Sequence, residues 1–150
     1  MAEPLLYSDL TLEDALHQFR EDNGLNTKYR DMRKTAQEHF ERHDIIHVLF
    51  GLDTSMRQEA QADGWTLFGT DISIGDIKAF FDLPEEKELI EDIGWWPITK
   101  TYFRAFPDYF RIAWKSRKLR KKWKWAGNRA YRSKTVAAIR REFGILRALG

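Results

Sequence analysis

Residues 43–59 read HDIIHVLFGLDTSMRQE, and this pattern predicts two helices joined by a short turn. Residues 45–50 are mostly apolar, as expected of a helix that packs inside a protein. Gly51 then signals the end of that helix, and Asp53 or Thr54 provides the polar side chain that starts the next one. We therefore expect an antiparallel helix hairpin, in which residues at equal distances from the turn lie side by side.

Four side chains of this stretch can bind a metal ion, namely those of His43, Asp44, His47 and Glu59. His43 and His47 are four positions apart, so on a helix they share one face. Asp44 precedes His47 by three positions, which places its carboxylate beside the same ring. His47 lies about one helical turn before the glycine, and Glu59 lies one to two turns after it. The hairpin is therefore expected to bring Glu59 to nearly the same height as His47.

Two histidines at this spacing are often found without a metal, because a His–Asp pair can simply complete its own hydrogen bonds. Here the pair lies among apolar residues, and burying such groups without a partner costs roughly 2–7 kcal/mol. We predict that the partner is a divalent metal ion. Imidazole and carboxylate ligands favour zinc, while iron, cobalt and manganese also fit. Asp44 either binds the metal or orients a ligating histidine, and His39 is expected to have a structural or supporting role.

The motif His-Asp-x-x-His, followed after eleven residues by Glu, resembles the signature of the coenzyme Q (ubiquinone) biosynthesis protein 4 family. The segment IRREFGI at residues 139–145 is also similar to the Arg- and Glu-rich helix that closes members of that family. The resemblance is specific at residues 38–60, extends to residues 133–145 and is loose between them. It identifies His43, Asp44, His47 and Glu59 as the candidate metal site and assigns no catalytic residue.

The resemblance implies a role in ubiquinone biosynthesis. The implied substrate is a prenylated quinone precursor, and the implied reaction is oxidative decarboxylation with hydroxylation at the ring carboxyl carbon of a polyprenyl hydroxybenzoate. Because the sequence has no flavin or nicotinamide fingerprint, the metal and O₂ would have to serve as the oxidant. The alternative is a non-catalytic scaffold that binds lipid or quinone and organises the other ubiquinone biosynthesis enzymes at the membrane.

The composition of the chain restricts the classes of protein that it can belong to. A length of 150 residues predicts a single domain, residues 1–150. The absence of cysteine excludes disulfide frameworks, thiol nucleophiles and Cys-ligated metal sites. Residues 1–9 lack the pattern of a secretory leader, and no apolar run is long enough to cross a bilayer. We expect a cytoplasmic protein that is peripheral to the membrane, with a homodimer among the assemblies considered.

Helical periodicity dominates the chain, which predicts an all-α single-domain bundle of five to seven helices. Helices are expected at residues 11–22, 28–50, from 55, 77–81, from 84, 107–122 and 133–144. Gly64, Gly69 and Gly75 follow the expected Glu59 helix and leave two interpretations open. They either break the helix into a loop or leave room for a long apolar ligand.

Charge is divided unevenly along the sequence. Residues 1–100 contain 10 Lys and Arg against 21 Asp and Glu, whereas residues 101–150 contain 15 against two. A basic aromatic segment, residues 104–134, carries most of this excess. Its aromatic residues recur at helical spacing and could pack on the core, lie in a membrane interface or stack on nucleic-acid bases. We favour an anionic membrane surface over nucleic acid, because the chain has no nucleic-acid-binding motif and the resembled family works at membranes.

Overall fold

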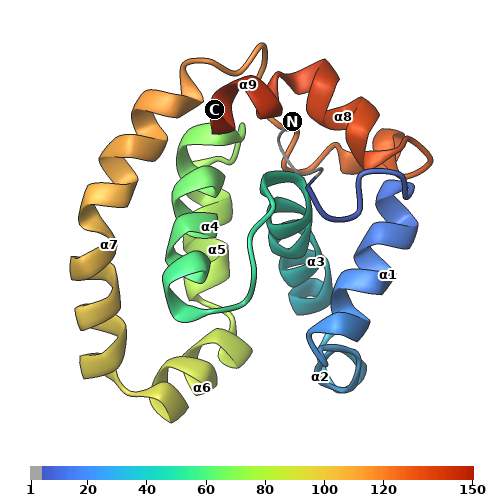
Figure 1. Ribbon diagram of the computed structural model, residues 1–150. Helices are drawn as coiled ribbons and strands as arrows, with labels where there is room; N and C mark the ends of the chain where they lie inside the picture. Colours follow the sequence, from blue (N-terminus) through green and yellow to red (C-terminus); the bar gives the residue numbers. More distant parts are fainter. Residues whose placement is uncertain (1–4) are drawn as a thin grey trace.

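The computed structural model describes residues 5–150, and this part of the chain is built from helices (Figure 1). In chain order the helices are α1 (Leu12–Asp22), α2 (Asn26–Arg30), α3 (Lys34–Phe50), α4 (Met56–Gly69), α5 (Ile74–Phe81), α6 (Pro84–Ile93), α7 (Trp95–Ser116), the 3-10 helix η1 (Asn128–Tyr131), α8 (Val136–Phe143) and α9 (Ile145–Leu149). The described residues contain two isolated β-bridges and no longer strand. The predicted all-α fold is confirmed. Residues 1–4, part of the stretch in which no leader was expected, lie outside the described residues.

The number and limits of the helices differ from the prediction of five to seven, since the described chain has nine α-helices. The single bent helix expected at residues 28–50 is divided into α2 and α3. Pro107 was expected to begin a helix but lies inside α7. It is Pro97 that occupies the first turn of α7, where a missing backbone N–H costs nothing. α7 contains both prolines, and the prediction took Pro107 as the start of the helix where the structure has Pro97 in the first turn.

The helices are arranged around α3, with α1 on one side and α4 on the other (Figure 1). α7 lies beyond α4 at the edge of the molecule, while α8 and α9 cross one end and α6 lies at the other. The close approach of α4 and α7 depends on Gly64, where a Cβ atom would lie 2.9 Å from Cδ1 of Tyr109. α4 continues through Gly64 and ends at Gly69. Gly64 therefore serves helix packing, and the predicted helix break lies at Gly69.

The hydrophobic core joins both ends of the sequence. Its members come from α1, α3, α4, α8 and the segment after α7, among other elements, and include Leu16, Phe19, Ile45, Leu49, Trp65, Trp123, Trp125, Ile139 and Phe143. Trp123 and Trp125 were expected to belong to the basic aromatic interface, yet each is only 1% exposed. The two indoles belong to the core because the chain turns back after α7, where the backbone N–H of Trp123 donates to the carbonyl of Gly69.

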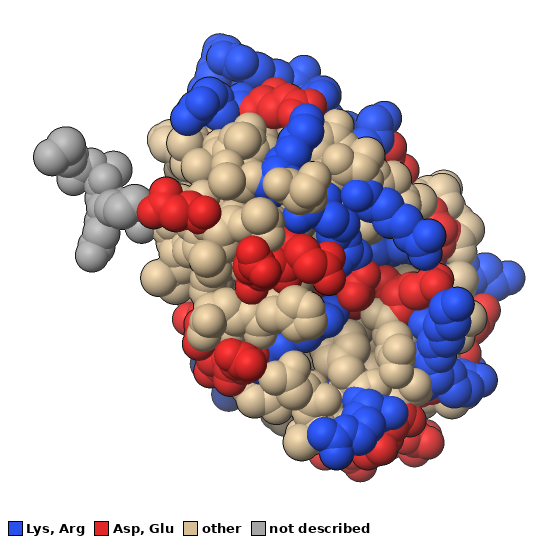
Figure 2. Space-filling model, turned by 90° about the vertical axis from the view of Figure 1, so that its right-hand side faces the viewer, with Lys and Arg blue, Asp and Glu red and all other residues tan. Residues whose placement is uncertain are grey.

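The uneven distribution of charge along the sequence is partly cancelled in space. Arg132 forms ion pairs with Glu13 and Glu41, which lie on α1 and α3. Lys124 likewise pairs with Asp71. On the face shown in Figure 2, basic and acidic side chains are intermixed. The excess positive charge that remains for an external partner is therefore smaller than the sequence suggests.

One arginine of α8 is buried and has no carboxylate partner among residues 5–150. The Arg140 side chain is 1% exposed and donates hydrogen bonds to the carbonyls of Val48 and Leu49 at the end of α3. It also donates to the carbonyl of Leu6 at 3.1 Å and to the Ser8 hydroxyl at 2.8 Å. Burial lowers the pKa of Arg140 to about 10. This guanidinium fastens residues 5–8 to the end of α3, where the partial negative charge of the helix terminus favours a cation.

None of the helices within residues 5–150 is both long and apolar enough to cross a membrane. The longest, α7, has 22 residues but carries charged side chains along its length.

Candidate metal centre

The turn between α3 and α4 places the candidate ligands. α3 ends at Gly51, which adopts the left-handed conformation with φ of 68°. Glycine accepts this conformation without strain, and the turn redirects the chain toward α4. Ser55 is the residue that caps α4, whereas Asp53 accepts a hydrogen bond from the Ser55 backbone and pairs with the Gln58 side chain. The predicted hairpin therefore forms, with its cap one residue later than expected.

Three of the four predicted ligands converge. Nε2 of His43 lies 3.0 Å from Oε2 of Glu59, and Nε2 of His47 lies 3.3 Å from the same oxygen. The two Nε2 atoms are 3.2 Å apart. Within the described residues these side chains form a group whose ligand atoms all lie within 4.8 Å of one another. We call His43, His47 and Glu59 the His–His–Glu group.

The His–His–Glu group fits a divalent metal in both chemistry and spacing. Ligand atoms around a tetrahedral zinc ion with bonds of about 2.1 Å are separated by roughly 3.4 Å. The separations in the group, 3.0, 3.2 and 3.3 Å, are close to this value. The side chain of His47 is 1% exposed and that of Glu59 is 41% exposed. The group is therefore anchored in the interior and reached from solvent on the side of Glu59.

Asp44, the fourth predicted ligand, lies outside the group. Its Oδ2 accepts hydrogen bonds from the Tyr29 hydroxyl and, at 3.2 Å, from Nε of Arg20. The guanidinium of Arg20 also lies over the Tyr29 ring. The structure therefore does not bring all four predicted ligands together, since Asp44 lies apart from the other three. Adjacent helical residues point about 100° apart, so Asp44 faces α1 and α2 while His43 and His47 face α4.

Ionisation of the group follows from these contacts. Burial alone would lower the pKa of His43, but the hydrogen bond with Glu59 and the charge of Asp63 outweigh it and raise this pKa to about 9. Burial would raise the pKa of Glu59, yet the hydrogen bonds from both imidazoles hold it well below its ordinary value. At neutral pH His43 and Glu59 thus form an ion pair, and a metal ion that binds here must displace the proton of His43.

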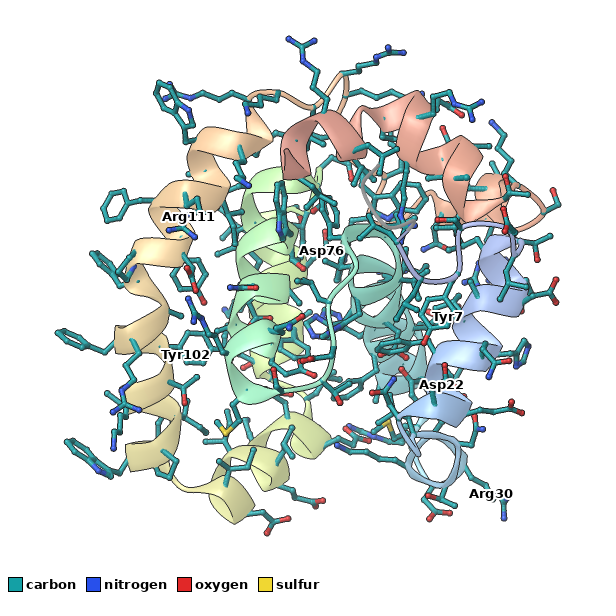
Figure 3. The ribbon with its side chains drawn as sticks, viewed as in Figure 1. Tyr7, Asp22, Arg30, Asp76, Tyr102 and Arg111 are labelled. Atoms are coloured by element: carbon teal, nitrogen blue, oxygen red, sulfur yellow. The ribbon has the colours of Figure 1, made fainter. Side chains whose placement is uncertain are left out.

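Two further residues contact the group and were not predicted. Oδ1 of Asp63 lies 3.8 Å from Nδ1 of His43. The Tyr102 hydroxyl of α7 donates a hydrogen bond to Oδ2 of Asp63, and Figure 3 shows Tyr102 on the side of α7 that faces α4. Asp63 could have been found from the sequence, since it follows Glu59 by four positions and shares its helix face. The sequence carries no such signal for Tyr102.

His39 has a structural role, as the sequence suggested. Its imidazole stacks on the Phe80 ring of α5, with the ring centres 4.2 Å apart, and meets the Trp125 ring edge-on. Burial lowers the pKa of His39 to about 4. A neutral imidazole held between two aromatic rings is suited to packing, and His39 is not part of the His–His–Glu group.

A cavity of about 370 Å³ lies beside His47. Its walls are mostly apolar and include Leu6, Tyr7, Phe19 and Leu52. The Tyr7 hydroxyl donates to Asp22 at 2.7 Å across this region, and both residues are labelled in Figure 3. A volume of this size lies within the range of small-molecule sites, roughly 300–1,000 Å³. The cavity therefore offers room for a ring-sized group next to the candidate metal centre.

Comparison with known proteins does not assign the chain to a family. No protein-family model, curated protein or solved structure matches it. The likeness to the coenzyme Q biosynthesis protein 4 family therefore rests on the residues of the motif, and function has to be argued from the geometry of the His–His–Glu group and its surroundings.

Proposed function

We propose that this chain is a metal-binding protein of ubiquinone biosynthesis that processes a polyprenyl hydroxybenzoate at the membrane. The observation that carries the proposal is the convergence of His43, His47 and Glu59. A divalent metal held by two imidazoles and one carboxylate acts as a Lewis acid on a substrate oxygen, and with iron it also supports O₂ chemistry. The resemblance of the motif to the coenzyme Q biosynthesis protein 4 family supports the choice of pathway.

The surroundings of the group support a ring-shaped apolar substrate. The cavity beside His47 is lined by Leu6, Phe19 and Leu52, which suit an aromatic ring or the start of a prenyl chain. The lining also contains Asp22 and Asp53 and no Lys or Arg. A ring carboxylate would therefore find no cationic side chain in the cavity, which favours its placement toward the metal centre.

The proposed reaction replaces the ring carboxyl group by a hydroxyl group and releases CO₂. This is a two-electron oxidation: we propose that water supplies the hydroxyl oxygen and that O₂ accepts the two electrons and two protons and is released as H₂O₂. The protein contributes orientation: the buried His47 fixes one side of the centre, while the partly exposed Glu59 leaves the other side open. The class of enzyme is thus a metal-dependent decarboxylase, with zinc, iron, cobalt or manganese as candidate ions.

The test measures metal and product in the same samples. Protein stripped by chelation is loaded separately with Zn²⁺, Fe²⁺, Co²⁺ or Mn²⁺ and incubated with prenylated 4-hydroxybenzoate in detergent under air. One of these ions is expected to support CO₂ release that His47→Ala abolishes and His39→Ala does not. Absence of bound metal in the wild-type protein would refute the proposal.

A scaffold role is the rival function. In this case the group binds metal only to hold α3 and α4 together, and the chain recruits the other ubiquinone biosynthesis enzymes. Metal binding without CO₂ release, together with loss of thermal stability on chelation, would favour the scaffold. Retention of the other enzymes by the membrane-bound protein in pull-down experiments would support it further.

The outer face of α7 supports attachment to an anionic membrane. Five large aromatic residues on this face, at intervals of seven, three, four and four, are between 59% and 82% exposed: Trp96, Phe103, Phe106, Phe110 and Trp114. We call them the aromatic stripe. Arg104 and Arg111 are also exposed, and helical spacing puts them along one edge of the stripe. Aromatic side chains beside basic ones are typical of a helix that lies in the membrane interface.

Binding to vesicles tests the membrane part of the proposal. The protein should sediment with vesicles that contain phosphatidylglycerol and much less with phosphatidylcholine alone, and single-stranded RNA should not compete. Binding to RNA without binding to vesicles would mean that the partner of this surface is nucleic acid and not a membrane. Formation of a dimer that is lost in Phe103→Ser would instead mean that the stripe pairs two copies of the chain. Either result contradicts the proposed attachment of α7 to a membrane.

A further inference from the structure

The imidazole of His43 is flanked by carboxylates on both of its nitrogens. Nε2 is 3.0 Å from Glu59 and Nδ1 is 3.8 Å from Oδ1 of Asp63. Glu59 and Asp63 lie one turn apart on α4, so their side chains share the face that is turned toward α3. A small rotation of either side chain would close the 3.8 Å separation to a hydrogen bond.

Asp63 is itself held by a second helix. Its Oδ2 accepts a hydrogen bond from the Tyr102 hydroxyl of α7. The Tyr102 ring stacks on that of Tyr109, with an angle of 15° between the ring planes. Tyr109 in turn packs where Gly64 leaves space on α4. The position of Asp63 is therefore set by the packing of α4 against α7.

The two imidazoles of the group differ in their second nitrogen. Nδ1 of His47 is buried and has no hydrogen-bond partner among the described residues. Nδ1 of His43 instead faces a carboxylate. A histidine that binds a metal through one nitrogen nearly always donates its other N–H to a carboxylate, a carbonyl or water, and this partner fixes the ring and raises its basicity. Only His43 has such a carboxylate here.

We propose that Asp63 is the positioning residue of the metal centre: it accepts a hydrogen bond from Nδ1 of His43 while Nε2 binds the metal, and Tyr102 holds it there. This inference rests on the proposed metal site. It assigns a role to two residues outside the His43–Glu59 motif. The orientation of the His43 ring would then depend on α7, through Tyr102 and Asp63. The opposite face of α7 carries the aromatic stripe.

Metal affinity of the purified chain, without substrate, tests the inference. Asp63→Asn keeps the shape of the side chain but removes the charge, and should weaken Zn²⁺ binding about 10- to 100-fold. Tyr102→Phe should weaken it by a smaller factor, and Asp63→Glu should restore part of the loss. The matched control is Tyr109→Phe, which removes a hydroxyl from the neighbouring ring of α7 and should bind Zn²⁺ as the wild type does. Thermal unfolding without metal is recorded for every variant.

The visible absorption of bound Co²⁺ separates positioning from a general loss of structure. Asp63→Asn should shift the Co²⁺ bands, because the orientation of one ligand changes, whereas Tyr109→Phe should leave them unchanged. Wild-type affinity and an unchanged Co²⁺ spectrum in Asp63→Asn would overturn the inference while the proposed metal site stands, provided that His43→Ala loses the metal. Failure of the wild-type chain to bind Zn²⁺ or Co²⁺ would overturn both.

Discussion

Nε2 of His43 and Nε2 of His47 lie 3.2 Å apart on successive turns of one helix. Protons on both nitrogens would repel each other at this separation, and the carboxylate of Glu59, which lies within hydrogen-bond distance of both, offsets that repulsion. A metal ion also removes this repulsion, because it binds the lone pairs of both nitrogens together with the carboxylate. Protons and metal therefore compete for the His–His–Glu group.

The competition predicts that metal affinity rises with pH. The pKa of His43 is raised to about 9, so at pH 7 its ring is protonated and metal binding must release that proton. Zn²⁺ affinity should increase about tenfold per pH unit from pH 7 and level off above about pH 9. Calorimetry in two buffers of different ionisation heat counts the protons released, with about one expected at pH 7. An affinity that is constant between pH 7 and 9 would contradict the assignment, and His39→Ala should not alter the slope.

Asp44→Asn should damage stability and leave metal binding intact. The buried carboxylate of Asp44 compensates Arg20 and accepts from Tyr29, and breaking such a pair costs roughly 3 kcal/mol. Glu59→Gln is the matched variant and should show the reverse balance, with a larger loss of Zn²⁺ affinity and a smaller loss of stability, because the Glu59 side chain is 41% exposed and its ion pair is screened by solvent. Urea unfolding and Zn²⁺ titration of both proteins distinguish the two roles. A loss of more than about tenfold in Zn²⁺ affinity for Asp44→Asn would instead make it a ligand or an orienting residue.

Two glycine substitutions should have opposite effects. In Gly64→Ala the new Cβ would lie 2.9 Å from Tyr109 and 3.0 Å from Ile112, so α4 and α7 must separate at a cost of about 1–3 kcal/mol. Gly75→Ala lies in the exposed first turn of α5, where the nearest atom is 3.6 Å away. It should stabilise the protein by about 0.5–1 kcal/mol, because alanine favours helix. Thermal unfolding measures both, and a stabilised Gly64→Ala would refute the packing role.

Arg140→Met should be strongly destabilising. It removes the donor from the buried carbonyls of Val48 and Leu49, and each buried acceptor left without a partner costs about 1–3 kcal/mol. Arg141→Met, at the exposed neighbouring position, is the control and should change stability by less than about 0.5 kcal/mol. Urea unfolding of the two variants gives the comparison. Equal stabilities would mean that residues 5–8 contribute little to the fold.

Membrane binding should separate into a charge-dependent and an aromatic part. Arg111→Glu with Lys118→Glu should remove binding that is sensitive to salt, since screening shortens from about 10 Å at 0.1 M to about 3 Å at 1 M salt. Phe103→Ser with Phe110→Ser should remove the part that persists in 1 M salt. Lys121 is unsuitable for reversal, because it pairs with Glu142 and lies over Phe143. Co-sedimentation across a salt series measures both parts, and identical salt curves for the two double variants would disprove the division.

The sequence predicted the hairpin because its signals are local. The spacing of His43 and His47, the glycine that ends α3 and the position of Glu59 are all set within a few helical turns. The direction of Asp44 could not be read in the same way. Which side of α3 it faces depends on α1 and α2, and its partners Arg20 and Tyr29 lie 24 and 15 positions away.

Features that depend on distant contacts were likewise hidden in the sequence. A tryptophan next to lysines looks the same whether it is exposed or buried, and only the return of the chain after α7 placed Trp123 in the core. Tyr102 reaches Asp63 across 39 positions. No periodicity within a helix specifies which residue of another helix will lie opposite, so such pairs require the packed structure.

The hydrogen bonds of Arg140 with residues 5–8 have a consequence for how the protein is made. The groups they join are 132–135 positions apart. A ribosome must therefore synthesise the chain at least as far as Arg140 before residues 5–8 meet their partner. Until then the end of α3 and its turn stay uncovered, although α3 and α4 can already pair. The His–His–Glu group can thus assemble early in translation, while residues 5–8 close over the neighbouring cavity only after α8 has been synthesised.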